Sequence, residues 1–294
     1  MKTQLSLIVF AAAAAFFIDG NAVAQTFHSH PIRIPGGSNV QVPGINDSGV
    51  MVANYTDSTG MAHCAMISGS TITQIVDPHT VGTGSGHGTS CWGINNAGEI
   101  VGSYSLSIWG NGFILSGGVY TDIIVPGATA GTTAYGINNV GQIVGSFADN
   151  VGQHGFLYTR SNGTFATLDV PGATVTLAIG INDGGTTTFI WLNSTSIFSG
   201  AILKNGHYRT LNVPGATQSE AFGINVHGWI DFSAQDASGV WHGYLYKGGT
   251  FTQYDVPVST NTFGFGINSS GQLVGGYNPT GNPTAGVGFE GRIQ

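Results

Sequence analysis

The sequence has few charged residues. Only 7% of its 294 residues are Asp, Glu, Lys or Arg, whereas a typical globular protein has roughly 25%. Lys and Arg together number seven and the formal net charge is −7, so a basic surface for nucleic-acid phosphates is excluded. The hydrophobic share of 41% is too high for a disordered chain and can supply a large core. The composition predicts a folded protein that does not bind nucleic acid.

Hydrophobic runs long enough to cross a membrane comfortably are missing as well. The one extended apolar run, residues 5–18, follows Lys2 and precedes Ala-Val-Ala at 22–24. This order is typical of an export signal with its cleavage site, and the run is short for a transmembrane helix. We therefore predict a signal peptide over residues 1–24, a single mature domain over 25–294, no membrane span, and a secreted or periplasmic location.

Cysteine is scarce. Cys64 and Cys91 are the only two in the chain. Exported proteins meet oxidising conditions, which favours a disulfide between them. The alternative is a pair of separate buried thiols, because sequence alone does not give the distance between the two residues.

Sustained helical periodicity is absent from the mature chain, and a repeat takes its place. The triplet Gly-Ile-Asn begins at Gly44, Gly93, Gly136, Gly180, Gly223 and Gly266. A period in the forties built from short strand-like runs indicates propeller blades. In the third repeat the β-branched and aromatic runs 132–138, 142–147, 154–159 and 164–170 are separated by Gly, Asn and Asp clusters. Each repeat is therefore predicted to supply four antiparallel strands.

The two ends of the chain complement each other. The sixth triplet is followed by strand signals that end near residues 286–292, one strand short of a full unit. Residues 28–37 end in the same Pro-Gly as the outer strands of other repeats. We therefore predict an all-β, six-bladed β-propeller in which an N-terminal strand completes the last blade. Such closure removes exposed sheet edges, and we expect a monomer. A β-solenoid is the competing fold.

Several phrases of the repeat resemble a known family. HGFLY (154–158), HGYLY (242–246), LDVPGA (168–173) and GINNVGQIVG (136–145) are similar to the HAF-repeat family of bacterial extracellular proteins. The resemblance implies secretion and a repeated β architecture, and it carries no catalytic residues. Three repeats depart from the family phrase, with Asn111, Ser199 and Val287 at the position of the His.

An Asn closes the triplet in every repeat. These residues are Asn46, Asn95, Asn138, Asn182, Asn225 and Asn268. Because all six must do the same local job, we predict that they cap tight turns by bonding to nearby backbone groups. Function is better sought where the repeat is broken.

The first departure is an insertion over residues 77–92. It brings His79 and His87 to a link between an outer strand and the next inner strand. In propellers such links share a face with the loops between the second and third strands. Imidazole titrates near neutral pH, so either His could act as an acid or base, although solvated and idle side chains are the plainer interpretation.

Aromatic residues are expected on the same face. The candidates for ligand contact are Trp92, Trp109, Phe198 and Trp241. Aromatic rings stack well on the apolar faces of sugars. Alternatively, Trp109 and Trp241 fill space between blades.

Two acidic departures lie in the fifth repeat. Glu220 occupies a position that should enter the central channel, and Asp231 replaces a Val that other repeats have in the core. A buried carboxylate must be paired or have a raised pKa. With His79 and His87, the two acids are the candidate catalytic residues, and together they could form an acid–base pair for glycosidic chemistry. The alternative is a solvated channel Glu and an Asp bonded to backbone amides.

The sequence does not fix the function beyond these alternatives. It carries no Ser nucleophile elbow, His-Glu-x-x-His, P-loop or dinucleotide motif, and we predict no cofactor and no metal site. The favoured hypothesis is a secreted propeller that binds an extracellular glycan or similar polar polymer on the face bearing the insertion. The alternatives are a polysaccharide-active hydrolase or lyase and a protein-interaction module.

Overall fold

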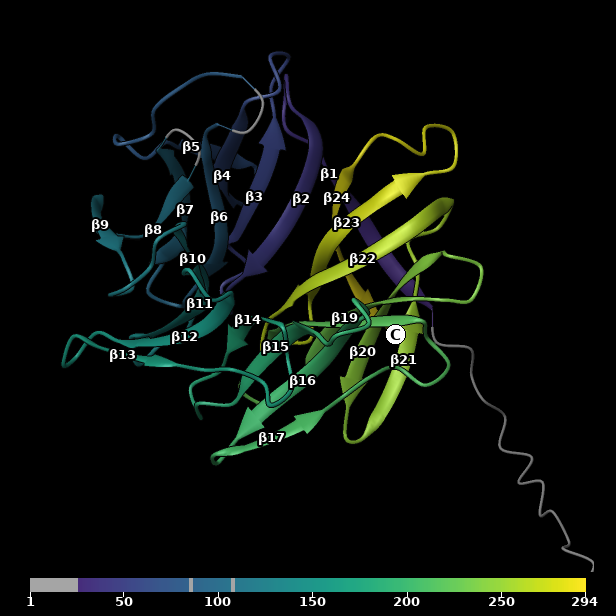
Figure 1. Cartoon of the computed structure of the whole chain (residues 1–294). Helices are drawn as coiled ribbons and strands as arrows, with labels where there is room; N and C mark the ends of the chain where they lie inside the picture. Colours follow the sequence, from purple (N-terminus) through teal and green to yellow (C-terminus); the bar gives the residue numbers. More distant parts are fainter. Residues whose placement is uncertain (1–25, 85–86, 107–108) are drawn as a thin grey trace, which may run out of the picture.

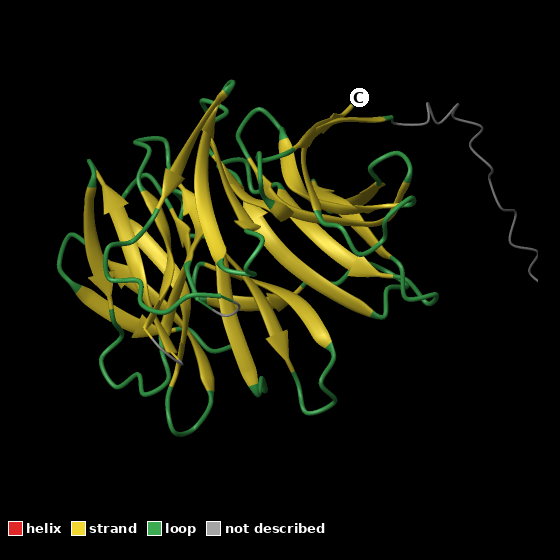
Figure 2. Cartoon of the chain, turned by 90° about the horizontal axis from the view of Figure 1, so that it is seen from above, coloured by secondary structure: helices red, strands yellow, loops and turns green. Residues whose placement is uncertain are grey.

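The computed structural model describes residues 26–84, 87–106 and 109–294, so the predicted signal peptide lies outside the described residues. Within the described part every regular element is a β-strand, and no helix occurs (Figure 2). The four strands predicted in the third repeat are confirmed, although the last of them ends early, at Thr167. The segment after it contains Pro171 and leads to the next strand, which begins at Val175. It leaves the ladder because proline cannot donate a ladder hydrogen bond.

The strands form antiparallel sheets in chain order. Four sheets have four strands each. The first contains β2 (Ser38–Ile45), β3 (Met51–Thr56), β4 (Ala62–Ser68) and β5 (Thr71–Ile75), and the second contains β6 (Thr89–Ile94), β7 (Ile100–Leu106), β8 (Trp109–Ser116) and β9 (Val119–Ile123). Another contains β18 (Gln218–Ile224), β19 (Ile230–Gln235), β20 (Trp241–Lys247) and β21 (Thr250–Tyr254), and the last contains β22 (Ser259–Ile267), β23 (Leu273–Pro279), β24 (Val287–Ile293) and β1 (Phe27–Ile32).

The fifth sheet has eight strands. It contains β10 (Thr132–Ile137), β11 (Gln142–Ala148), β12 (Gln153–Thr159), β13 (Thr164–Thr167), β14 (Val175–Ile181), β15 (Thr187–Leu192), β16 (Phe198–Lys204) and β17 (His207–Thr210). A single parallel pair, Gln153 with Val175, joins its first four strands to its last four. The sheets fan out around a common centre (Figure 1). The predicted all-β, propeller-like fold is confirmed.

The N-terminal strand closes the fold as predicted. β1 pairs antiparallel with β24 over six residues, from Phe27 opposite Ile293 to Ile32 opposite Gly288. In Figure 1 the purple first strand lies beside the yellow last strands. The Phe27 ring also packs edge-on against Phe289, with 5.6 Å between the ring centroids. Hydrogen bonds and apolar packing therefore both hold the two ends together.

The core lies between neighbouring sheets and contains one fully buried Phe in most repeats. In the second repeat Phe113 on β8 faces Gly102 on β7. In the fourth repeat the sizes are exchanged, with Phe189 on β15 facing Ala201 on β16. Either way one ring fills the space, because close-packed interiors tolerate an exchange that conserves volume.

The predicted disulfide is confirmed. Cys64 on β4 and Cys91 on β6 are bonded, with 5.6 Å between their Cα atoms. Between the next two sheets the corresponding positions hold Gly112 and Ala134, which also approach closely. The bridge therefore replaces an ordinary small-residue contact and ties the inserted segment to the first sheet.

The repeated Asn residues cap turns, as predicted, and they do more. In the fifth repeat the Asn225 side-chain oxygen accepts hydrogen bonds from the backbone N–H groups of His227 and Trp229, both at 3.0 Å. Each Asn also donates from its side-chain nitrogen to the backbone carbonyl of the next Asn. The six distances in chain order, starting with Asn46 to Asn95 and ending with Asn268 back to Asn46, are 3.1, 3.3, 3.1, 3.0, 3.0 and 3.2 Å. The Asn side chains thus form a closed ring that links every inner strand to its neighbour.

Candidate functional site

A cavity of about 360 Å³ occupies the centre of the molecule. The residue before Gly in each triplet contributes a side chain to its wall. These residues, the floor ring, are Pro43, Trp92, Tyr135, Ile179, Phe222 and Phe265. All six are partly exposed, so solvent reaches them. The floor ring is entirely apolar or aromatic apart from the Tyr hydroxyl and the Trp N–H.

A second ring lies two residues earlier on the same strands. Its members, the rim ring, are Gln41, Ser90, Thr133, Leu177, Glu220 and Phe263. Gln41 and Leu177 line the cavity directly. Since side chains two residues apart on a strand share a face, the rim ring stands beside the floor ring. Four of its six members are polar, and the ring lies at the end where the inserted segment enters β6.

Aromatic contacts connect the cavity wall to the rim. Phe222 meets Phe265 edge-on, with 5.0 Å between centroids. Phe265 and Phe263 are stacked on one strand, with an interplanar angle of 11°. Phe263 then contacts Trp241 at 5.7 Å. Trp241 is thus part of a continuous aromatic surface, and it is only partly exposed, so it combines packing with access to solvent.

Glu220 is the acidic member of the rim ring. It lies opposite Ser233 on β19 and shares a strand face with Phe222. Burial raises the pKa of its carboxyl to about 7, because the charged form is poorly solvated there. Among the described residues the carboxylate has no hydrogen-bond or ion-pair partner. That Glu220 enters the channel stays a prediction, because the residue stands beside the cavity and is not among those that line it.

Asp231 is buried in the interface with the next sheet and has no exposed surface. Its carboxylate accepts a hydrogen bond from the Tyr254 hydroxyl at 2.6 Å. Burial raises its pKa well above the ordinary value, while hydrogen bonds from Tyr254 and from the amides of Phe232 and Gly266 oppose the rise. Asp231 does not share an open cleft with Glu220, because it is enclosed. The predicted acid–base pair is therefore not what this geometry provides.

The surroundings of Asp231 explain why a carboxylate is tolerated in the core. Other repeats place Ile75, Ile123 or Leu211 where this one has Tyr254. Three other repeats have Ala at the position of Gly264. A Cβ on Gly264 would collide with both the Asp231 carboxylate and the Tyr254 hydroxyl. Three coupled departures thus build one polar contact inside an apolar interface.

The two His residues of the insertion have separate partners. The His79 ring bonds to Asp77 at 3.0 Å, and its side chain is 55% exposed. The His87 ring lies 3.0 Å from the carbonyl oxygen of Val81. His87 also accepts through its backbone carbonyl from Ala62 at the start of β4. This contact confirms that the insertion and a loop between second and third strands share a face.

The predicted aromatic residues are divided between two places. Trp92 belongs to the floor ring and meets Tyr135 edge-on at 5.5 Å. Phe198 begins β16, away from the cavity wall, and is partly exposed. Trp109 begins β8, but its side chain lies outside the described residues. Sequence reasoning missed Tyr135, Phe222 and Phe265, although the position before each Gly could have been compared across the repeats.

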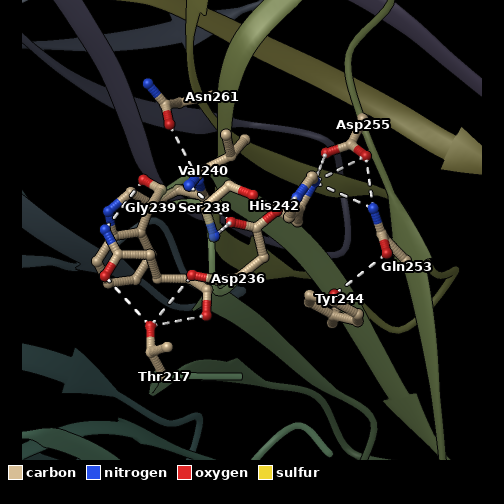
Figure 3. Close-up of polar contacts among 12 residues, drawn as sticks. Thr217, Asp236, Ser238, Gly239, Val240, His242, Tyr244, Gln253, Asp255 and Asn261 are labelled. Carbon is tan, nitrogen blue, oxygen red and sulfur yellow. Dashed lines mark hydrogen bonds and ion pairs between the residues drawn. The ribbon is translucent and has the colours of Figure 1, made fainter. Parts of the chain in front are cut away.

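The His of the family-like phrase is held between two acceptors. Figure 3 shows His242 on β20, with one ring nitrogen 3.0 Å from Asp255 and the other 3.5 Å from Asp236. In the third repeat His154 is placed in the same way between Asp169 and Asp149. These carboxylates raise the pKa of His154, chiefly through the hydrogen bond that the His ring donates to Asp169. In the repeats that have it, this His fastens the third strand to a loop and to the outer strand.

Two absences hold for the described part of the chain. No group of three or more His, Cys, Asp or Glu side chains there is arranged to hold a metal ion. No helix there is long and apolar enough to pass through a membrane.

The fold is similar to several solved structures. AofleA from Arthrobotrys oligospora is 13% identical over 92% of this chain and 88% of its own, with a TM-score of 0.58. The Aleuria aurantia lectin AAL, in complex with Fucα1-6GlcNAc, is 12% identical over 85% and 90%, with a TM-score of 0.50. A TolB-like protein from Agrobacterium tumefaciens is 11% identical over 78% and 87%, with a TM-score of 0.58. At such identities the likeness shows the fold alone. No protein-family model and no curated protein sequence matches the chain.

Proposed function

We propose that this protein binds a saccharide unit of an extracellular glycan in its central cavity. The observation that carries the proposal is the pairing of the two rings, with a polar rim beside an aromatic and aliphatic floor. A sugar has apolar C–H faces and polar hydroxyl edges, so it can stack on rings such as Trp92 and Phe265 while the rim exchanges hydrogen bonds. Protein ligand pockets of about 300–1,000 Å³ are usually apolar with a few convergent polar groups. The cavity is at the small end of that range.

The architecture proposed for this function has six blades. The six Gly-Ile-Asn triplets, the single parallel pair within the eight-stranded sheet and the closed Asn ring support that count. One fold neighbour is a lectin in complex with a fucosyl disaccharide, which adds support for a glycan ligand without identifying it. Export, membership of the HAF-repeat family and a monomeric state are parts of the same proposal. The Cys64–Cys91 disulfide is what an exported protein would carry.

An enzyme acting on the same glycan is the second candidate. The observation that favours it is Glu220, since a carboxyl group with a pKa near 7 can serve as a general acid at neutral pH. Two-carboxylate glycosidases also need a second accessible acid. Asp231 is enclosed, so catalysis by this pair would require the interface to open.

The test is a binding screen on a panel of polysaccharides and oligosaccharides, followed by calorimetry. Trp92→Ala removes one aromatic side chain from the floor ring, and Trp229→Ala removes a Trp outside the cavity as a control. We expect Trp92→Ala to weaken the best ligand at least about tenfold, or about 1.4 kcal/mol, with the control unchanged. Equal affinities in both variants, or no saccharide bound at all, would contradict the proposal. Steady release of shorter sugars would support the enzyme instead.

A further inference from the structure

Glu220, an unpaired acid of the rim ring, shares a strand face with Phe222 of the cavity wall. Resting on the proposed function, we propose that the saccharide it binds carries a protonated amine, as a basic amino sugar of the glucosamine type does. Three features support this: the carboxylate beside the cavity, the ring faces of the cavity wall, and the lack of a basic side chain among the described residues that line it.

Glu220 is the acidic residue of the rim ring, and the protein does not neutralise it. Its neighbours on the same face are Gln218 and Phe222, with Ser233 opposite. The adjoining strand β22 carries no charged residue. The titratable groups facing this interface are Asp231 on β19 and Tyr254 on β21, which bond to each other. A cationic group on the ligand would pair with the Glu220 carboxylate, which has no cationic partner in the described part of the protein.

The ring faces favour the same chemistry. The floor ring provides Trp92, Tyr135, Phe222 and Phe265, and Phe263 adds one more ring at the level of Glu220. Aromatic faces attract ammonium groups, most strongly where water is excluded. Elsewhere in this chain such a pair is already satisfied, with the Lys247 ammonium 3.9 Å from the centroid of a Trp229 ring.

Among the described residues, no basic side chain lines the cavity. Neither Lys nor Arg occurs among the residues that line it. A neutral sugar would leave Glu220 desolvated and unpaired, which costs free energy for a charged carboxylate. A sugar bearing an ammonium group would pair with the carboxylate and stack on the adjacent rings. The geometry therefore selects a cationic saccharide over its neutral counterpart.

The experiment compares two matched ligands by calorimetry at pH 7, glucosamine tetramer and N-acetylglucosamine tetramer. They differ in acetylation, which removes the positive charge. The protein variants are wild type, Glu220→Gln, and Glu290→Gln as a control that removes a carboxyl group on β24 instead. We expect wild type and Glu290→Gln to prefer the amine at least about tenfold, and Glu220→Gln to lose that preference.

The failures can be told apart. Equal affinity of wild type for both tetramers would overturn the cationic preference while leaving saccharide binding intact. A preference that persists in Glu220→Gln would assign it to the overall negative charge of the protein and would also overturn the inference. If neither these tetramers nor any glycan of the panel bound, the proposed function itself would fail. Tetramethylammonium is the last probe, and its binding without any saccharide would contradict an amino-sugar ligand.

Discussion

Across the six repeats, the residue at one end of the inner strands is always the same, whereas the residue at the other end varies. At one end six identical Asn residues form a closed ring of hydrogen bonds. At the other end the six rim positions hold Gln, Ser, Thr, Leu, Glu and Phe. The same strands join the two ends, so strand geometry does not explain the contrast. The Asn ring is identical because each member must fit its neighbours, whereas the rim side chains stand beside the cavity and need not fit one another.

We infer from this contrast that the Asn ring serves stability and the rim ring serves binding. A change in the Asn ring removes contacts both within a turn and between sheets, so it should damage stability. A change in the rim ring should alter binding and leave the fold intact. The following predictions test that division, from the largest expected effect to the smallest.

Breaking the Asn ring should cost the most. Asn225→Ala removes two turn-capping hydrogen bonds and the bond to the Asn268 carbonyl. We expect a loss of about 3 kcal/mol in the free energy of unfolding, because a cap and a buried hydrogen bond disappear together. The matched change at the other end, Gln41→Ala, should stay within about 0.5 kcal/mol because that side chain is exposed. Similar urea midpoints for the two variants would remove the distinction between the ends.

The polar contact behind the rim should be the next most sensitive. Gly264→Ala places a methyl group against Asp231 and Tyr254, and we expect a loss of about 2 kcal/mol from overpacking. Adding Asp231→Val and Tyr254→Ile recreates the cluster of Ala134, Val101 and Ile123 found between the second and third sheets. The triple variant should recover most of the stability in thermal melts. A triple variant as unstable as the single one would show that these departures are not coupled.

Replacing Glu220 should stabilise the protein at high pH, whereas the single changes above should destabilise it. Its folded pKa is raised to about 7, so the folded state holds the proton more tightly than the unfolded chain. Stability from this group is therefore present at low pH and falls as pH rises from about 4.5 to about 7. Glu220→Gln should match wild type at pH 4.5 and exceed it at pH 8 by about 2 kcal/mol, allowing for partial exposure. Chemical denaturation at both pH values measures the difference, and a variant less stable at pH 8 would refute it.

A change in the His154 cluster, in which the ring lies between Asp149 and Asp169, should have the smallest effect on stability. Carboxylates at 2.8 and 3.4 Å raise the pKa of His154. A raised His pKa contributes stability that is complete below the unfolded value and is lost as pH rises through the folded value. His154→Asn should therefore cost about 0.5 kcal/mol at pH 5.5 and less at pH 9, since such pairs are partly screened. A cost that does not change with pH would mean that packing, not charge, holds this side chain.

Much of the fold was predictable because a repeat states the same local rule several times. The triplets, the turn residues and the complementary chain ends predicted strands, closure and capping, and β1 pairing with β24 confirmed the closure. The site was less predictable. Glu220 and Trp241 broke the repeat visibly, but Phe222 and Phe265 lie inside it and gave no such signal. Their role as cavity wall follows from curvature of the sheets around a centre, which no single repeat encodes.

The sequence by itself determined the elements, because alternation of apolar and polar residues and the placement of Gly, Asn and Pro act over a few neighbouring residues. Only the tertiary structure decided what surrounds the two acids. The sequence placed Glu220 toward the channel and Asp231 in the core, but it did not show that burial raises the pKa of Glu220 or that Asp231 is enclosed against Tyr254. The surroundings of Asp231 come from its own sheet, through Tyr254, and from the next sheet, through Gly264. Desolvation depends on everything within a few ångströms, and that neighbourhood exists only after the sheets have packed.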